Sequence, residues 1–138
     1  MLLLAMVLSA TETFAQTVGT VFEYGGCEYR VSKKDLQNTA LNEAVVLTVK
    51  GTGKVVIPTK VQTPDGMDKE WYTVTGIAPW VSSVADGVTE IEFSEGFKEI
   101  SENSLRKPKT LQKIIFLHLV RKWAKGAFLI VQHLRLLR

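Results

Sequence analysis

The sequence predicts a mainly β protein in which a short-stranded N-terminal cap, residues 16–80, precedes about two turns of a repeat solenoid, residues 81–138. Two observations predict this class. Short segments with alternating apolar and polar residues lie between turn residues, and apolar positions recur every 23 residues in the second half. The 138-residue chain is 46% hydrophobic and 22% charged, which is enough apolar material for one packed core.

The N-terminus has the organisation of a secretory signal peptide, which we assign to residues 1–15. Leu2–Leu8 form an apolar run that is too short to span a bilayer as a helix, although no Lys or Arg precedes it. Thr13 and Ala15 are the small residues that a signal peptidase accepts before its cleavage point. A buried N-terminal strand or helix is the alternative. We therefore expect an exported protein, secreted or associated with the cell surface or outer membrane.

The cap region is predicted to consist of strands joined by tight turns. The segment "TVFEYGGCEYRVS" indicates a hairpin, because Gly25-Gly26 supplies the positive φ that its turn requires. Between "LQNTALNE", a loop or single helical turn, and residue 58, "EAVVLTVKGTGKVVI" indicates two strands with a hairpin turn at 51–53. In "VQTPDGMDKEWYTVTGI", Pro64-Asp65-Gly66 is predicted as a surface turn before a strand at "WYTVT".

The second half repeats itself at a spacing of 23 residues. Within one unit, Ile91 and Phe93 alternate with Glu90 and Glu92, as in a strand with one buried face. Since stacked units share a core, a fixed period of this length predicts a solenoid, with a β-sandwich of evenly spaced strands as the alternative. The predicted core comprises Val74, Ile77, Val88, Ile91, Phe93, Phe97, Ile100, Leu105, Leu111, Ile114, Phe116, Val120, Trp123 and Phe128.

Charge is unevenly distributed along the chain. Residues 106–138 contain nine Lys and Arg and no Asp or Glu, whereas residues 1–105 contain eight basic and 14 acidic residues. Such asymmetry suits an anionic partner, and "LIVQHLRLLR" loosely fits an amphipathic lipid-binding segment. Trp123 and Phe128 fall in apolar repeat positions, which favours a core role over stacking on bases. We therefore predict no nucleic-acid partner and no stable membrane span in the mature chain.

The sequence contains no residue pattern typical of catalysis or metal binding. A thiol nucleophile needs a base within hydrogen-bond reach, but Cys27 is remote in sequence from His118 and His133, the two histidines. A zinc site needs three or four ligands, and the glutamates at 90–102 accompany no Asp-rich calcium loop. We therefore predict no enzyme, no cofactor, and no catalytic or metal-binding residue. A reactive Cys27 beside a histidine is the enzymatic alternative.

Five motifs occur in the order found in a known family of surface proteins. They are "FEYGGCEYRVS", "GKVVIP", "WYTVTGIA", "VTEIEFSEGFKEI" and "LQKIIF…WAKGAF". Together they cover nearly all of residues 20–134 and resemble the N-terminal part of BspA-like leucine-rich-repeat surface proteins of Bacteroides-type bacteria. Two departures stand out. Ser94 and Leu117 replace a proline that is usual in that family, and the tail "LIVQHLRLLR" lacks the usual polar turn, as in a truncated sequence.

The resemblance implies a non-enzymatic leucine-rich-repeat protein whose function is adhesion or recognition of a host extracellular protein or glycan. Solenoids present extended faces suited to such binding. The strand positions expected on that face are Thr89, Glu90, Glu92 and Lys113. The alternative is a structural cap or truncated fragment of a larger surface repeat protein with no ligand of its own. Such a fragment would self-associate through its C-terminal repeat end.

Overall fold

The computed structural model describes residues 16–79, 82–101, 104–105 and 109–117, and the backbone of 122–123 and 135–137. The predicted signal peptide, Val120, Phe128, both histidines and most of the basic tail lie outside the described residues. The described residues form twelve strands and one 3-10 turn, η1 (Thr39–Leu41), which lies within the predicted loop or helical turn. The strands are β1 (Val21–Tyr24), β2 (Cys27–Lys33), β3 (Glu43–Val49), β4 (Gly53–Ile57), β5 (Lys60–Gln62), β6 (Trp71–Ile77), β7 (Ser83–Val84), β8 (Val88–Phe93), β9 (Glu99–Ile100), β10 (Lys113–Phe116), β11 (Lys122–Trp123) and β12 (Arg135–Leu137).

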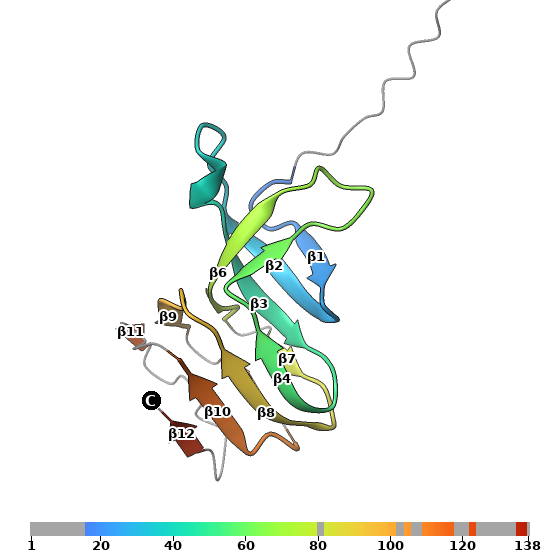
Figure 1. Cartoon of the computed structure of the whole chain (residues 1–138), viewed down its shortest axis with the longest axis vertical. Coiled ribbons are helices and arrows are strands. Elements are labelled where there is room, and N and C mark those ends of the chain that lie inside the picture. The colour runs from blue at the N-terminus through green and yellow to red at the C-terminus, as the bar shows by residue number, and fades with distance from the viewer. Residues whose placement is uncertain are drawn as a thin grey trace, which may run out of the picture.

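The larger sheet, sheet A, has eight strands in the order β1-β2-β3-β6-β9-β11, with β5 paired to β6 and β7 paired to β3. Its first three strands are antiparallel, and β3, β6, β9 and β11 continue it in parallel. The turn between β1 and β2 is the predicted hairpin, because Gly25 and Gly26 have φ of 57° and 82° and Tyr24 pairs with Cys27. In Figure 1 this part of sheet A occupies the upper half of the molecule.

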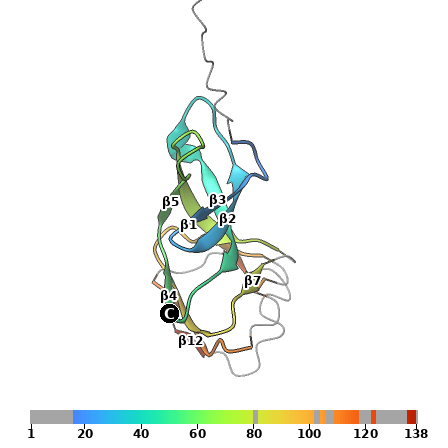
Figure 2. The same cartoon turned by 90° about the vertical axis from the view of Figure 1, so that its right-hand side faces the viewer.

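The smaller sheet, sheet B, has the order β12-β10-β8-β4, and every strand pair in it is parallel. The predicted hairpin turn at 51–53 is therefore wrong, because β3 belongs to sheet A and β4 to sheet B. Gly51 and Gly53, with φ of 130° and 65°, make a sharp turn that carries the chain from one sheet to the other. Figure 2 shows the result, with β4 and β7 on opposite sides of the lower half.

Strand pairing follows the spacing found in the sequence at several places. In β8 and β10, Ile91 lies opposite Ile114 and Phe93 opposite Phe116, an offset of 23 residues. The same offset of 23 relates β6 to β9 and β9 to β11. The last pair differs, because Ile114 lies opposite Leu136, an offset of 22 rather than the 23 that aligns it with Leu137. The mainly β class is confirmed.

The predicted core positions are buried wherever the structure describes their side chains, with exposed fractions of 6% or less. They are Val74, Ile77, Val88, Ile91, Phe93, Phe97, Ile100, Leu105, Leu111, Ile114 and Phe116. The rings of Phe93, Phe97 and Phe116 pack with centroids 4.5 to 5.6 Å apart. Burial of one such side chain contributes roughly 1.5–3 kcal/mol, so these positions are a main source of stability.

The cap has an aromatic cluster of its own that continues the same core. Phe22, Tyr29 and Tyr72 are almost completely buried, and the Phe22 ring centroid lies 6.0 Å from that of Tyr29 and 5.6 Å from that of Tyr72. One connected set of buried side chains runs from these rings to the residues between sheets A and B. The cap and the strands of residues 82–117 therefore share a core and do not form separate packing units.

Candidate functional site

The four predicted recognition residues lie on the outer face of sheet B. Thr89, Glu90 and Glu92 belong to β8 and Lys113 to β10. Along β8 these residues alternate with buried apolar side chains, as the sequence pattern indicates. All four are half-buried, and the side chains of Glu92 and Lys113 are 19% and 35% exposed. The structure therefore brings the four residues together, but on a partly covered surface.

A row of ion pairs accounts for this partial burial. The Lys54 ammonium on β4 lies 2.5 Å from a Glu92 carboxylate oxygen and 3.6 Å from one of Glu90. On the other side of Glu90, the Lys113 ammonium lies 3.5 Å away. The hydrogen bond to Glu92 raises the pKa of Lys54. We call Lys54, Glu90, Glu92 and Lys113 the charge row.

Sequence reasoning did not find Lys54. It lies opposite Glu90 across the β4–β8 pair, but 36 residues earlier in the chain, outside the repeat spacing. The exposed Val56 lies next to it on the same face and opposite Glu92. The opposite charges already neutralise one another, which suits contact with a partner surface that carries both signs of charge.

Cys27 is buried at the end of the β1–β2 hairpin and is 2% exposed. Desolvation by burial raises the pKa of its thiol, and the Sγ lies 3.7 Å from the Lys50 carbonyl oxygen. Its predicted alternative partners, the two histidines, lie outside the described residues. Within those described residues, no group of three or more His, Cys, Asp and Glu is placed to hold a metal ion.

We expect the Cys27 thiol to react slowly with iodoacetamide in the native protein and quickly in urea. The thiolate is the reactive form, and burial both hides the sulfur and raises its pKa, so little thiolate is present at about pH 8. A mass-spectrometric time course with glutathione as the reference measures this. A native rate equal to that of glutathione would show an accessible thiol and revive the enzymatic alternative.

A buried polar cluster ties the end of β2 to the start of β6. The Lys34 side chain, 9% exposed, forms an ion pair with Glu70, and its ammonium lies 5.7 Å from the centre of the Tyr72 ring. The Tyr72 hydroxyl donates a hydrogen bond of 2.8 Å to the same carboxylate. Burial, followed by this hydrogen bond, raises the pKa of Tyr72. The cluster links segments far apart in sequence and serves to hold them together.

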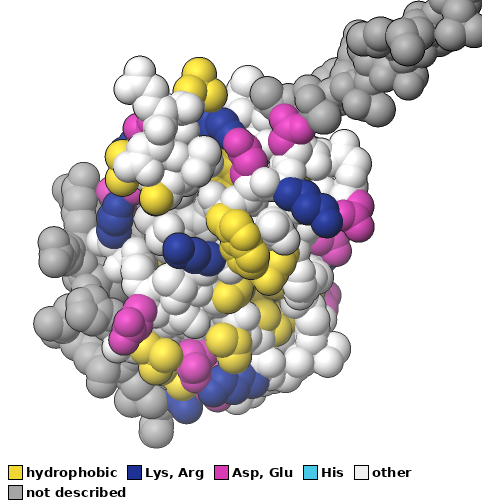
Figure 3. Space-filling view, turned by 45° about the horizontal axis from the view of Figure 1, so that its top comes forward, with side chains coloured by type: hydrophobic (Ala, Val, Ile, Leu, Met, Phe, Trp, Pro, Cys, Tyr) yellow, Lys and Arg dark blue, Asp and Glu magenta, His cyan; other side chains and the backbone are white. Residues whose placement is uncertain are grey.

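Two shallow depressions lie on sheet A. The first, of about 400 Å³, lies between the end of β1 and the segment 62–69. Trp71 is exposed beside it and contacts Tyr24, which lines it. Figure 3 shows a group of hydrophobic side chains in the middle of one face, surrounded by charged ones.

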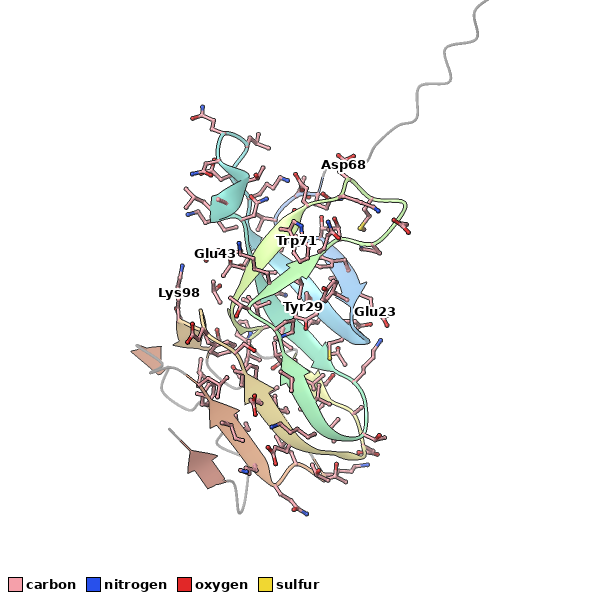
Figure 4. All side chains as sticks on the ribbon, viewed as in Figure 1. Glu23, Tyr29, Glu43, Asp68, Trp71 and Lys98 are labelled. Carbon is pink, nitrogen blue, oxygen red and sulfur yellow. The ribbon has the colours of Figure 1, made fainter. Side chains whose placement is uncertain are left out.

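The second depression, of about 250 Å³, contains a polar network on the outer face of β3, β6 and the segment around β9. The Lys98 ammonium lies 2.5 Å from a Glu43 carboxylate oxygen, and the Thr75 hydroxyl donates a 3.3 Å hydrogen bond to the other oxygen. Figure 4 shows Glu43 and Lys98 on the left-hand side of the view and Glu23, beside the first depression, on the right. Because the two charges neutralise each other, this network stabilises the sheet and leaves no free charge for a ligand.

No known protein family and no curated protein matches this chain. A similar solved structure is the crystal structure of the pneumococcal vaccine antigen PcpA, with 18% identity, a TM-score of 0.45 and coverage of 78% of this chain. The chain spans 31% of the length of that antigen. In the described part of the chain, none of the helical structure is long and apolar enough to cross a membrane. The contacts within the protein are therefore the basis for assigning a function.

Proposed function

We propose that the protein is an exported, non-enzymatic leucine-rich-repeat protein that recognises a host extracellular protein or glycan at a cell surface. The observation that supports this proposal best is the parallel pairing of strands at an offset of 23 residues, which occurs in both sheets. A chain that advances by a fixed number of residues per strand pair builds the extended, regular face that repeat proteins use for binding. The motif order that resembles BspA-like proteins points to the same function.

The outer face of sheet B is the surface that suits this role. Parallel strands present side chains in straight rows about 4.8 Å apart. One row contains Lys54, Glu90 and Lys113, and the next contains Val56, Glu92 and Ile115. A partner can therefore meet alternating charges beside an apolar edge. Rows of this kind favour specificity through charge complementarity more than raw affinity.

Binding to cells tests the proposal. Beads coated with the protein should bind cultured epithelial cells in a saturable manner, and Glu92→Lys should weaken binding about tenfold by breaking the charge row. Glu28→Lys is the matched control, because Glu28 is also a strand glutamate paired with a lysine, Lys50 at 3.0 Å, but on sheet A. Trypsin or glycosidase treatment of the cells then separates a protein partner from a glycan partner.

The outcome of this experiment distinguishes the two functional hypotheses. Saturable binding that Glu92→Lys weakens and Glu28→Lys preserves supports recognition through sheet B. Binding that never saturates, or that both variants reduce equally, contradicts it and favours a structural cap without a ligand of its own. Circular dichroism of each variant controls for folding.

A further inference from the structure

We propose that Tyr24 and Trp71 form the aromatic platform of a binding site for a neutral saccharide, located in the depression between β1 and the segment 62–69. This inference deepens the proposed recognition function and rests on it. It assigns a ligand class to a surface of the cap that is separate from the charge row on sheet B.

The aromatic pair provides a flat and fixed apolar surface. Trp71, the first residue of β6, is 49% exposed, whereas its neighbour Tyr72 points into the core. The Tyr24 ring packs partly against the core, and its centroid lies 6.3 Å from that of Trp71 at an interplanar angle of 64°. This edge contact holds the indole in place. Tryptophan and tyrosine offer large contact areas at low entropic cost, and a flat ring fits the C–H face of a pyranose.

Polar groups of the right kind surround the platform. Gln62 lies directly opposite Trp71 in the β5–β6 pair and lines the depression, together with Glu23, Asp65 and Lys69. The amide of Gln62 can donate and accept hydrogen bonds, and the carboxylates of Glu23 and Asp65 accept them. Sugar hydroxyls do both. The combination of a stacking surface and convergent polar groups is what a small-ligand site requires.

The loop that carries these groups is held in its conformation before any ligand binds. The Thr63 hydroxyl donates a 2.5 Å hydrogen bond to the Asp68 carbonyl and accepts one of 2.9 Å from the Glu70 N–H. The Asp65 carboxylate forms an ion pair with Lys69 at 2.9 Å. Because the loop is already ordered, binding requires less loss of conformational entropy.

The charges and the shape favour a neutral saccharide over an anionic one or a peptide. Two carboxylates, of Glu23 and Asp65, face a single ammonium, that of Lys69, which is already paired. An anionic sugar would meet net repulsion at this position. The residues that line the depression make it shallow and equally polar and apolar, without the deep apolar pocket that anchors a peptide side chain.

The test is an NMR titration of the ¹⁵N-labelled full chain with three neutral disaccharides: N,N′-diacetylchitobiose, lactose and maltose. At least one should shift the Trp71 indole N–H signal in a saturable manner, with a Kd on the order of 1 mM. Trp71→Ala should abolish the saturable shifts, and 3′-sialyllactose should bind at least about tenfold more weakly. Val56→Ala is the matched control, since Val56 is 52% exposed but lies on sheet B.

Each result has a defined meaning. The site is overturned if none of the three neutral disaccharides produces saturable shifts, if the shifts persist in Trp71→Ala, or if 3′-sialyllactose binds as tightly as the neutral sugars. Cell binding that is retained without saccharide binding overturns this site and leaves the proposed function standing. Saccharide binding that is retained while no saturable cell binding occurs contradicts the proposed function alone.

Discussion

Replacement of Ile91 by aspartate should abolish folding of the protein. Ile91 is 0% exposed and lies between Val55 on β4 and Ile114 on β10 in the middle of sheet B. A lone carboxylate at this position has no partner and loses its hydration, which costs several kcal/mol. Domains of this size are stable by only about 5–15 kcal/mol. The variant also loses the apolar contacts of the isoleucine, so the native state is not the favoured one.

Urea denaturation followed by circular dichroism measures this effect. The wild-type protein should unfold in a cooperative transition, and Ile91→Asp should show none. Val56→Asp is the matched control, because it makes a closely similar change on the adjacent strand at a side chain that is 52% exposed. Its cost should stay within about 1 kcal/mol. Equal destabilisation by both variants would contradict the assignment of the inner and outer faces of sheet B.

Glu70→Ala should destabilise the protein by about 3 kcal/mol, the effect of leaving a buried charge without its partner. The Lys34 side chain is 9% exposed and would lose its only carboxylate partner among the contacts that the structure describes. The Tyr72 hydroxyl, itself buried, would lose its acceptor at the same time. The change therefore leaves two buried donors with lost hydrogen bonds.

The shift of the urea midpoint at constant slope measures this loss. Asp65→Ala is the control, because it removes an ion pair with Lys69 whose side chains are 91% and 65% exposed, which should cost less than about 1 kcal/mol. In a double variant, Lys34→Met with Glu70→Leu, stability should partly return, since no buried charge remains. A double variant less stable than Glu70→Ala would show that the cluster stabilises the fold by more than mutual neutralisation.

Local patterns in the sequence predicted the core well. The alternation of Ile91 and Phe93 with glutamates predicts which face of β8 is buried, because side chains of a strand alternate between its two faces. The glycine pair at 25–26 predicts a hairpin, because the positive φ at both positions suits the turn. Each of these predictions depends on residues that are close together in the chain.

Predictions that depend on the choice of distant partners were less successful. The turn at 51–53 has the composition of a hairpin turn, but β3 pairs with β2, β6 and β7, and β4 pairs with β8. Packing against the shared core decides this choice, and a short sequence window does not contain it. The contact of Tyr24 with Trp71 and the pairing of Lys54 with Glu92 arise in the same way.

The shared offset of 23 residues also constrains how this chain can change in length. A segment of that length contributes one strand to each sheet, β8 and β9 in one case and β10 and β11 in the next. Duplication of a whole segment would thus add a strand to both sheets and leave existing pairs intact. Insertion of a single residue inside β8 would reverse the faces of the following positions. A gene encoding this architecture therefore tolerates growth in complete units far better than small insertions.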